Sequence, residues 1–315
     1  MKKIIFLLIT AGIVTFLNGC KKAEEPSDGK PVIAFVMKTL NNPYFIEMQK
    51  GAEETAKKLG VNLLIQAAER EVDVEKQMQI IENLIQRRVS AICITPSGSK
   101  EIIPAISKAN EAGIPVIIVD TRIDDKTLNE SGAKIETFIG SDNIDGGRIA
   151  GKFIVDKLGG KGNVVVLEGI PGHETGDARL KGFYEVINNS RGIKVIESQT
   201  ANWERDQGYS VFQNILQAHP DVEAVFACND MMALGAVEAI SASKTKKKII
   251  VVGFDAIKDS RDAIMNDKMD GSVAQHPEEM GKLSVEYAEK IIKGEKIPSE
   301  IPVRIELITK DRLQK

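Results

Sequence analysis

The chain has 315 residues, with 42 lysines and arginines against 45 aspartates and glutamates, which gives a formal net charge of −3. This balance argues against a nucleic-acid-binding protein, since such proteins carry an excess of basic residues and the local basic run at 244–248 is typical of a solvated loop. The length is enough for two lobes that each bury a hydrophobic core.

The first twenty residues predict export and a lipid anchor. Lys2 and Lys3 precede a mostly apolar run at 4–16, which is too short to span a bilayer comfortably and is typical of a signal peptide. The Leu-Asn-Gly-Cys sequence that follows resembles the end of a bacterial lipoprotein signal at 1–19, with cleavage before Cys20 and a lipid on its sulfur. An ordinary secretion signal with an incidental cysteine is the alternative. Residues 20–30 are mostly polar and predict a flexible tether to the membrane.

Two further cysteines, Cys93 and Cys228, lie in apolar runs that are typical of buried strands. Export permits disulfide bonds, so a bridge between the two is one interpretation. We favour two buried free thiols, because the lobe assignment given below separates them. The three histidines stand apart, and no cysteine–histidine spacing resembles a metal site, so we expect neither a metal nor a cofactor.

Apolar runs rich in valine and isoleucine alternate along the chain with amphipathic stretches of helical periodicity. This alternation predicts an α/β fold with parallel sheets, because strands buried on both faces have continuous apolar sequences. The eleven expected strands exceed one comfortable open sheet, so we expect two similar lobes. The expected strands are Val32–Met37, Val61–Ala67, Ala91–Thr95, Pro115–Asp120, Thr137–Ser141, Asn163–Glu168, Lys194–Thr200, Ala224–Cys228, Ile249–Phe254, Gly271–Gln275 and Val303–Ile308.

Hydrogen-bonding side chains stand at the ends of four of these runs. They are Asp120, Asn229 with Asp230, Asp255, and Gln275. Any one of them could instead be the N-cap of a helix. Because ligands bind at the carboxyl ends of parallel strands, four such positions predict a shared binding cleft.

Aromatic side chains flank these polar positions. The segment TLNNPYF at 39–45 joins the first strand to the first helix, and it combines amides with Tyr44 and Phe45. Phe254 and the single tryptophan, Trp203, each adjoin a strand end, although an ordinary packing role is the alternative for Trp203. Sugar hydroxyls donate and accept hydrogen bonds, so a sugar site needs both kinds of partner. With the charged Arg179 added, these residues predict a site for a small hydroxylated ligand such as a sugar.

In these motifs the chain resembles the periplasmic sugar-binding proteins of the ribose and allose type, which serve ABC importers. The resemblance covers residues 31–310. It is carried by TLNNPYF, VDTRID, SDN with the paired glycines after it, ARLKGF, ANWERD, ACNDMMALGA, VVGFDA and AQHPEEMG. It implies an α/β fold of two Rossmann-like lobes, each a parallel sheet flanked by helices, joined by three hinge crossings. The N-terminal lobe would comprise 31–141 and 276–303, and the C-terminal lobe 142–275 and 304–315.

The resemblance also implies which residues contact the ligand. Lys38 matches a lysine of the allose-type pattern. One departure is that Thr121 separates Asp120 from Arg122, whereas ribose-type members place arginine directly after the acid. The loop that follows is more allose-like and Phe254 is more ribose-like, so the identity of the sugar stays open. The implied contact residues are Lys38, Asn42, Tyr44, Phe45, Asp120, Arg179, Trp203, Asn229, Phe254, Asp255 and Gln275.

The function that the resemblance implies is that of a lipid-anchored, extracytoplasmic substrate-binding protein. It would capture an unphosphorylated monosaccharide, an allose- or ribose-like pyranose, by hinge closure and deliver it to the permease of an ABC transporter. It would act as a monomer without enzymatic activity. Binding of another polyol such as inositol or xylose, or a role as a sugar receptor for a chemoreceptor or sensor kinase, is the alternative.

Two other classes of protein agree less well with the N-terminal sequence. A sugar-responsive transcriptional repressor with this core fold would need an N-terminal helix-turn-helix, where this chain has an export signal. A nucleotide-binding dehydrogenase would need a G-x-G-x-x-G motif after the first strand, where TLNNPYF stands instead.

Overall fold

The computed structural model describes residues 29–243, 245 and 247–315. The predicted signal peptide, the predicted lipidation site Cys20 and nearly all of the predicted tether therefore lie outside the described residues. Within the described part of the chain, no helix has both the length and the apolar character needed to cross a membrane.

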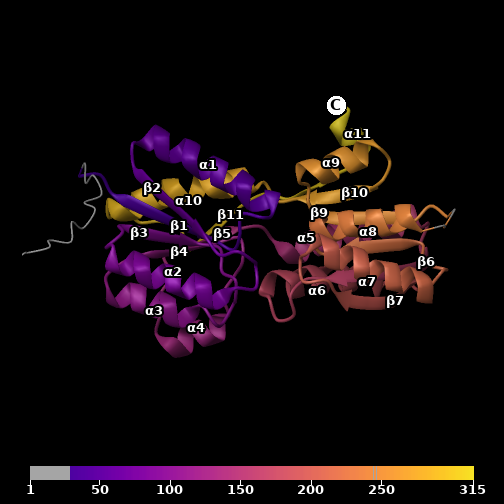
Figure 1. Cartoon of the computed structure of the whole chain (residues 1–315), viewed down its shortest axis with the longest axis horizontal. Helices are drawn as coiled ribbons and strands as arrows, with labels where there is room; N and C mark the ends of the chain where they lie inside the picture. The colour runs from indigo at the N-terminus through magenta and orange to yellow at the C-terminus, as the bar shows by residue number, and fades with distance from the viewer. Residues whose placement is uncertain (1–28, 244, 246) are drawn as a thin grey trace, which may run out of the picture. The chain divides into compact units, whose positions relative to one another are not determined.

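The first sheet contains six parallel strands in the order β11-β5-β4-β3-β1-β2 (Figure 1). Its central strands are buried along their whole length because their valine and isoleucine side chains pack under helices on both faces. The strands are β1 (Val32–Met37), β2 (Asn62–Ala67), β3 (Ala91–Ile94), β4 (Val116–Val119), β5 (Thr137–Gly140) and β11 (Glu300–Pro302).

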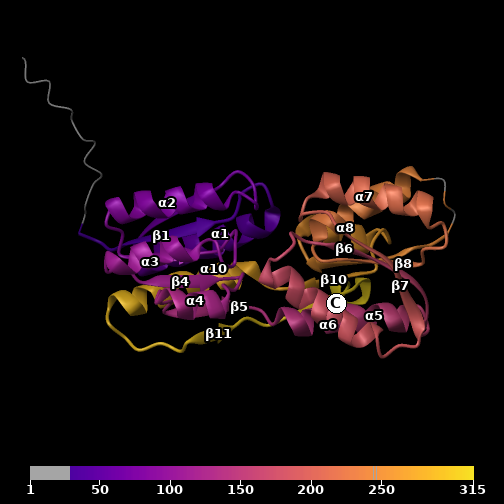
Figure 2. The same ribbon diagram turned by 90° about the horizontal axis from the view of Figure 1, so that it is seen from below.

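The second sheet also contains six strands, in the order β12-β10-β9-β8-β6-β7, and only β12 runs antiparallel to its neighbour. The two mostly parallel sheets with helices on their faces confirm the predicted two-lobe α/β fold class (Figure 2). The strands are β6 (Lys161–Glu168), β7 (Gly192–Thr200), β8 (Ala224–Ala227), β9 (Ile250–Asp255), β10 (Gly271–Ala274) and β12 (Glu306–Ile308).

The helices begin and end where the local sequence favours it. For example, Asn42 caps the first helix, Pro43 opens it, and Gly60 ends it in the left-handed conformation. The helices are α1 (Pro43–Leu59), α2 (Val74–Gln86), α3 (Ile103–Glu111), α4 (Asp125–Ser131), α5 (Asn143–Lys157), α6 (Glu174–Ile187), α7 (Arg205–Ala218), α8 (Asp230–Ala242), α9 (Lys258–Met265), α10 (Pro277–Ile292) and α11 (Lys310–Leu313).

The chain passes between the two sheets three times: from β5 to β6, from β10 to β11, and from β11 to β12. The sequence analysis predicted a strand at Val303–Ile308, and the structure corrects its extent. Only 306–308 of that run form a strand, β12, which pairs with β10 of the second sheet. The strand β11 at 300–302, which pairs with β5 of the first sheet, was not predicted, because three residues that include a proline are too short a run to stand out. The lobe boundaries that the resemblance implies stay a prediction.

Both described cysteines are free thiols, as we favoured from the sequence. Cys93 lies in β3 of the first sheet, and Cys228 directly follows β8 of the second. Burial raises the pKa of both thiols, that of Cys228 to about 12, so neither is ionised at neutral pH.

Helices α5 and α6 approach each other closely through glycines. A Cβ atom at Gly182 would lie 1.8 Å from the Ile144 carbonyl oxygen, and one at Gly147 would lie 2.1 Å from the Arg179 carbonyl oxygen. Any side chain at these positions would force the helices apart. This contact fixes α6, which carries Arg179.

We predict that Gly182→Ala lowers the free energy of unfolding by about 1–3 kcal/mol, although alanine has the higher helix propensity, because its methyl group overlaps α5. Urea unfolding measures the change. Lys181→Ala, at the neighbouring exposed position of α6, is the control and should stay within about 0.5 kcal/mol of the unaltered chain. An alanine at position 182 that leaves stability unchanged would show that the helices separate freely.

Candidate functional site

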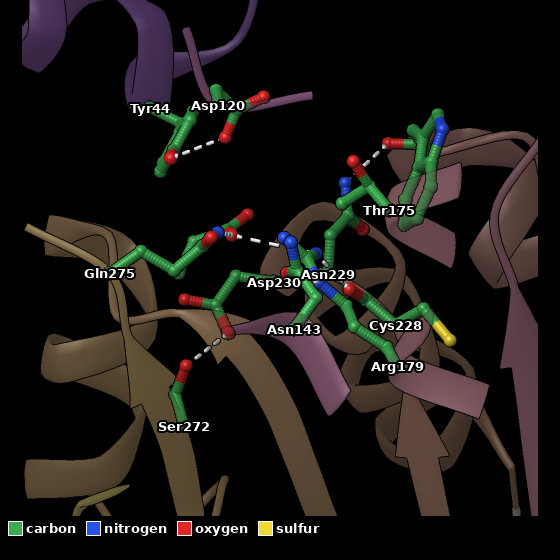
Figure 3. A network of polar contacts seen from close by, with 12 residues as sticks. Tyr44, Asp120, Asn143, Thr175, Arg179, Cys228, Asn229, Asp230, Ser272 and Gln275 are labelled. Carbon is green, nitrogen blue, oxygen red and sulfur yellow. Dashed lines mark hydrogen bonds and ion pairs between the residues drawn. The ribbon is translucent and has the colours of Figure 1, made fainter. Parts of the chain in front are cut away.

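The carboxyl ends of strands from both sheets surround a cavity with about 290 Å³ of empty volume, which we call the inner cavity. Ten of the eleven predicted contact residues line it, and Figure 3 shows several of them approaching one another from the two sheets. Two further residues in the lining were not predicted, Glu71 and Thr175. The lining residues are Lys38, Asn42, Tyr44, Phe45, Glu71, Asp120, Thr175, Arg179, Trp203, Asn229, Asp255 and Gln275.

The first helix brings Asn42 and Tyr44 to the inner cavity. The Asn42 Oδ1 atom accepts a hydrogen bond from the Tyr44 backbone N–H at 3.0 Å, so Asn42 is also the N-cap of α1. The Tyr44 hydroxyl donates to Asp120 Oδ1 at 2.7 Å (Figure 3). Burial raises the pKa of Tyr44 well above its ordinary value, and the charge of Asp120 adds to this effect. Tyr44 therefore stays a neutral donor beside a carboxylate.

Asp120 directly follows β4 with a φ angle of 65°, a left-handed conformation that is uncommon for aspartate. The Thr121 hydroxyl donates to its Oδ2 atom at 2.9 Å, and Lys38 Nζ lies 3.9 Å from the same oxygen. Backbone strain of this kind is typical of functional positions. The strained turn presents the carboxylate to the inner cavity.

Arg179 reaches the inner cavity from α6 and is held by two hydrogen bonds. Its Nε atom donates to Asn143 Oδ1 at 2.9 Å, and its Nη1 atom donates to the Cys228 carbonyl oxygen at 2.5 Å (Figure 3). The guanidinium carbon lies 3.8 Å from the ring centroid of Phe254.

Phe254 is the one predicted contact residue that is not among the described residues lining the inner cavity. It is fully buried beneath the guanidinium group of Arg179.

Asp255 and Gln275 form the wall beside Arg179. The Gln275 Nε2 atom donates to Asp255 Oδ1 at 2.7 Å, and Arg179 Nη1 lies 3.8 Å from the same oxygen. Burial raises the pKa of Asp255 well above its ordinary value, and the Arg179 charge opposes that rise. Asp255 and Ala256 have φ angles of 112° and 52°, so this turn is strained as well.

Asp230 supports that turn and does not line the inner cavity, although the sequence grouped it with Asn229. Its Oδ2 atom accepts hydrogen bonds from the Ile257 backbone N–H at 2.9 Å and from the Ser260 hydroxyl. Its Oδ1 atom accepts from the Ser272 hydroxyl at 2.7 Å, and that hydroxyl accepts from the Ala256 backbone N–H at 2.9 Å. Burial raises the pKa of Asp230 to about 6, against the serine hydrogen bonds. Asp230 thus anchors the turn that positions Asp255.

Asn229 and Trp203 are linked to each other in the lining of the inner cavity. The Asn229 Oδ1 atom accepts from the Met232 backbone N–H at 2.9 Å, and its Nδ2 atom donates to the Trp203 carbonyl oxygen at 3.0 Å. Asn229 is therefore both an N-cap and a cavity residue, the two roles that the sequence left open. In the described part of the chain, the buried Trp203 Nε1 and Gln275 Oε1 atoms have no hydrogen-bond partner.

Other polar residues turn away from the inner cavity. Arg122 forms an ion pair with Glu300, and its guanidinium carbon lies 3.8 Å from the ring centroid of Phe138.

The described residues contain no group of three or more histidine, cysteine, aspartate or glutamate side chains suited to a metal ion. Glu71 was missed because it lies four positions beyond the end of β2, and Thr175 because it lies in the first turn of α6.

The two lobes also meet beside the inner cavity. The Thr175 hydroxyl donates to Thr121 Oγ1 at 3.2 Å, and the Glu174 backbone N–H donates to Ser99 Oγ at 3.3 Å. His173, the residue before α6, is buried at this contact. Its pKa is lowered to about 3, mainly by burial and also by the nearby Lys38 charge, and a hydrogen bond with the Ser97 backbone opposes both effects. The imidazole is therefore neutral in the folded protein.

This depressed pKa predicts a loss of stability in acid. As the pH falls from about 6.5 towards 3, the unfolded chain binds a proton at His173 that the folded chain does not, so the free energy of unfolding falls. We expect His173→Gln to remove this contribution and to make the decline shallower in that range. Urea unfolding of both proteins at several pH values measures the difference, and parallel curves would contradict the assignment.

Several known proteins are similar to this chain in sequence. The family model described as a periplasmic binding protein domain matches residues 33–296. The ribose import binding protein RbsB of Bacillus subtilis is 39% identical over 318 residues, covering 98% of this chain and 99% of that protein. The D-allose-binding periplasmic protein of Escherichia coli is 35% identical over 272 residues, covering 84% and 88%.

Two solved structures of solute-binding proteins have folds similar to that of this chain. An ABC transporter periplasmic solute-binding protein from Actinobacillus succinogenes with bound D-allose aligns with a TM-score of 0.86 and 39% identity, covering 90% of this chain and 99% of that one. A solute-binding protein from Bacillus halodurans with bound myo-inositol aligns with a TM-score of 0.84 and 28% identity, covering 92% and 98%.

Proposed function

The chain belongs to the periplasmic binding protein family, and on that premise we propose that it is the sugar-binding component of an ABC importer. The relatives described above are solute-binding proteins of transporters and not enzymes. The observation that carries the proposal is the inner cavity, where acids, amides, an arginine and aromatic rings from both sheets face one small volume.

The chemistry of the inner cavity suits a hydroxylated ligand. Carboxylates accept hydrogen bonds, arginine and lysine donate them, and amides do both, so a ring of hydroxyl groups finds partners in every direction. The Trp203 Nε1 donor and the Gln275 Oε1 acceptor, which lack partners within the described residues, add one of each. Buried Asp120 and Asp255 would repel a phosphate, so the ligand is unphosphorylated.

The inner cavity suits one small ligand, because residues from both sheets converge on a single small space. Allose- and ribose-like pyranoses are the proposed ligands. Another polyol such as inositol or xylose is the alternative, and the similar fold of a protein with bound myo-inositol is compatible with it.

Hinge closure is the mechanism we propose for capture, as in other periplasmic binding proteins. A ligand can stabilise a closed form only through contacts that it makes better in that form. Asp120 from the first lobe and Arg179 from the second would meet this condition by binding one sugar together. The closed protein would then deliver the sugar to the permease.

The lipid anchor on Cys20 is part of the same proposal and rests on the Leu-Asn-Gly-Cys sequence at the end of the apolar N-terminal run. It would keep the protein at the outer side of a membrane, close to the permease. Mass spectrometry of the mature protein tests it. A diacylated Cys20 at the N-terminus is expected, and an unmodified cysteine would contradict it.

Titration with pentoses, hexoses and inositols, followed by the fluorescence of Trp203, tests the function. We expect saturable binding of at least one unphosphorylated monosaccharide and none of its phosphate ester, because the inner cavity is lined by buried acids. A folded protein that binds no member of the panel would refute the proposal.

Variants at the inner cavity check the site in the same titration. Asp120→Ala and Arg179→Ala should each weaken binding at least about tenfold, since a hydrogen bond to a charged group contributes about 1.5–3 kcal/mol. Arg122→Ala is the matched control and should change affinity less than about twofold, because Arg122 pairs with Glu300 outside the inner cavity.

A further inference from the structure

We propose that Glu71 binds the sugar directly and selects among sugars through one hydroxyl group at the Asn42 end of the inner cavity. This inference rests on the proposed function and deepens it. Neither the strand-end pattern nor the family resemblance pointed to Glu71. The structure alone brings it to the site.

The geometry around Glu71 leaves its carboxylate incompletely paired. The residue lies in the loop between β2 and α2 and is 7% exposed. Its Oε1 atom accepts a hydrogen bond from Asn42 Nδ2 at 3.0 Å. Its Oε2 atom lies 3.9 Å from Lys38 Nζ, which is beyond hydrogen-bond distance.

Lys38 is placed between two carboxylates. Its Nζ atom is 3.9 Å from Glu71 Oε2 and also 3.9 Å from Asp120 Oδ2. A ligand hydroxyl between these groups could accept from the ammonium group and donate to a carboxylate, which would turn two long ion pairs into short charge-assisted hydrogen bonds. The arrangement is therefore suited to a hydroxyl that both donates and accepts.

A purely structural role does not account for a charged group at this position. Burying a carboxylate is costly unless hydrogen bonds and a close counter-ion compensate for lost hydration. Burial raises the pKa of Glu71, and Lys38 and Asn42 oppose that rise. A glutamine could accept the Asn42 hydrogen bond at lower cost. The acid is better explained by a hydroxyl donor that the ligand brings.

Glu71 also stands where the inner cavity meets a second one. Asn42, Glu71 and Trp203 line both, and the second, which we call the outer cavity, has about 770 Å³ of empty volume and includes Glu69, Arg70 and Glu204. A substituent of the sugar that points towards the outer cavity must pass Glu71. A hydroxyl there gains a hydrogen bond, whereas its absence leaves the Oε2 atom of a buried acid without that donor, and sites of this kind discriminate strongly.

A double-mutant cycle between protein and ligand tests the proposal. Calorimetry would measure the affinity of the unaltered chain and of Glu71→Gln for the best sugar of the panel and for each of its monodeoxy analogues. We expect one deoxy position to weaken binding at least about tenfold in the unaltered chain and less than about threefold in Glu71→Gln, since both changes remove the same contact. Other deoxy positions should show no such coupling.

Two further variants make the result decisive. Glu204→Gln removes an acid that lines the outer cavity alone and should leave every affinity within about twofold. Glu71→Asp keeps the charge but withdraws the carboxylate by one methylene, so it should reproduce the loss of coupling if Glu71→Gln does not fold.

The outcomes distinguish a failure of the proposed sugar-binding function from a failure of the proposed role of Glu71. If the unaltered chain binds no sugar, the proposed function and this inference both fail. If it binds a sugar and Glu71→Gln binds all analogues with the affinities of the unaltered chain, only the inference fails. A uniform loss of affinity across all analogues would likewise overturn it, because it would show that Glu71 supports the fold of the loop and reads no hydroxyl.

Discussion

The buried guanidinium group of Arg179 is the interaction on which the second half of the site depends. It joins four segments: α6, which carries it, Asn143 at the start of α5, the Cys228 carbonyl after β8, and the ring of Phe254 in β9. Its charge also stands 3.8 Å from the buried Asp255. A buried charge is stable only where its partners are fixed, so this one group requires several strand ends to keep their relative positions.

In the first half of the site the buried charges are mainly acidic, and they too depend on partners held in fixed positions. Asp120, Glu71 and Lys38 are all buried, and two of the three are acids. Each acid has a neutral donor of its own, Tyr44 for Asp120 and Asn42 for Glu71, so the single ammonium group does not have to compensate both. The site therefore holds charge in a form that a hydroxylated ligand can still reach.

Much of the fold could be predicted from the sequence, because parallel strands buried on both faces have continuous apolar sequences. Continuous valine and isoleucine runs located ten of the strands, and the polar residue at the end of a run located Asp120, Asp255 and Gln275. The same reasoning could not find Glu71, which reaches the cavity from within a loop, nor the three-residue strand β11. It also could not separate Asn229 from Asp230, because neighbouring residues share a pattern but point in different directions.

The three passages of the chain between the sheets constrain how the molecule can be assembled. The first sheet receives its last strand at 300–302 and the second at 306–308, and α10, which packs against α1, is made only after β10. The first sheet and its α10 cover are therefore complete only after 302, and the second sheet only after 308. The last strand of each sheet therefore comes from the same short C-terminal segment, so neither sheet has all six strands until that segment has been made.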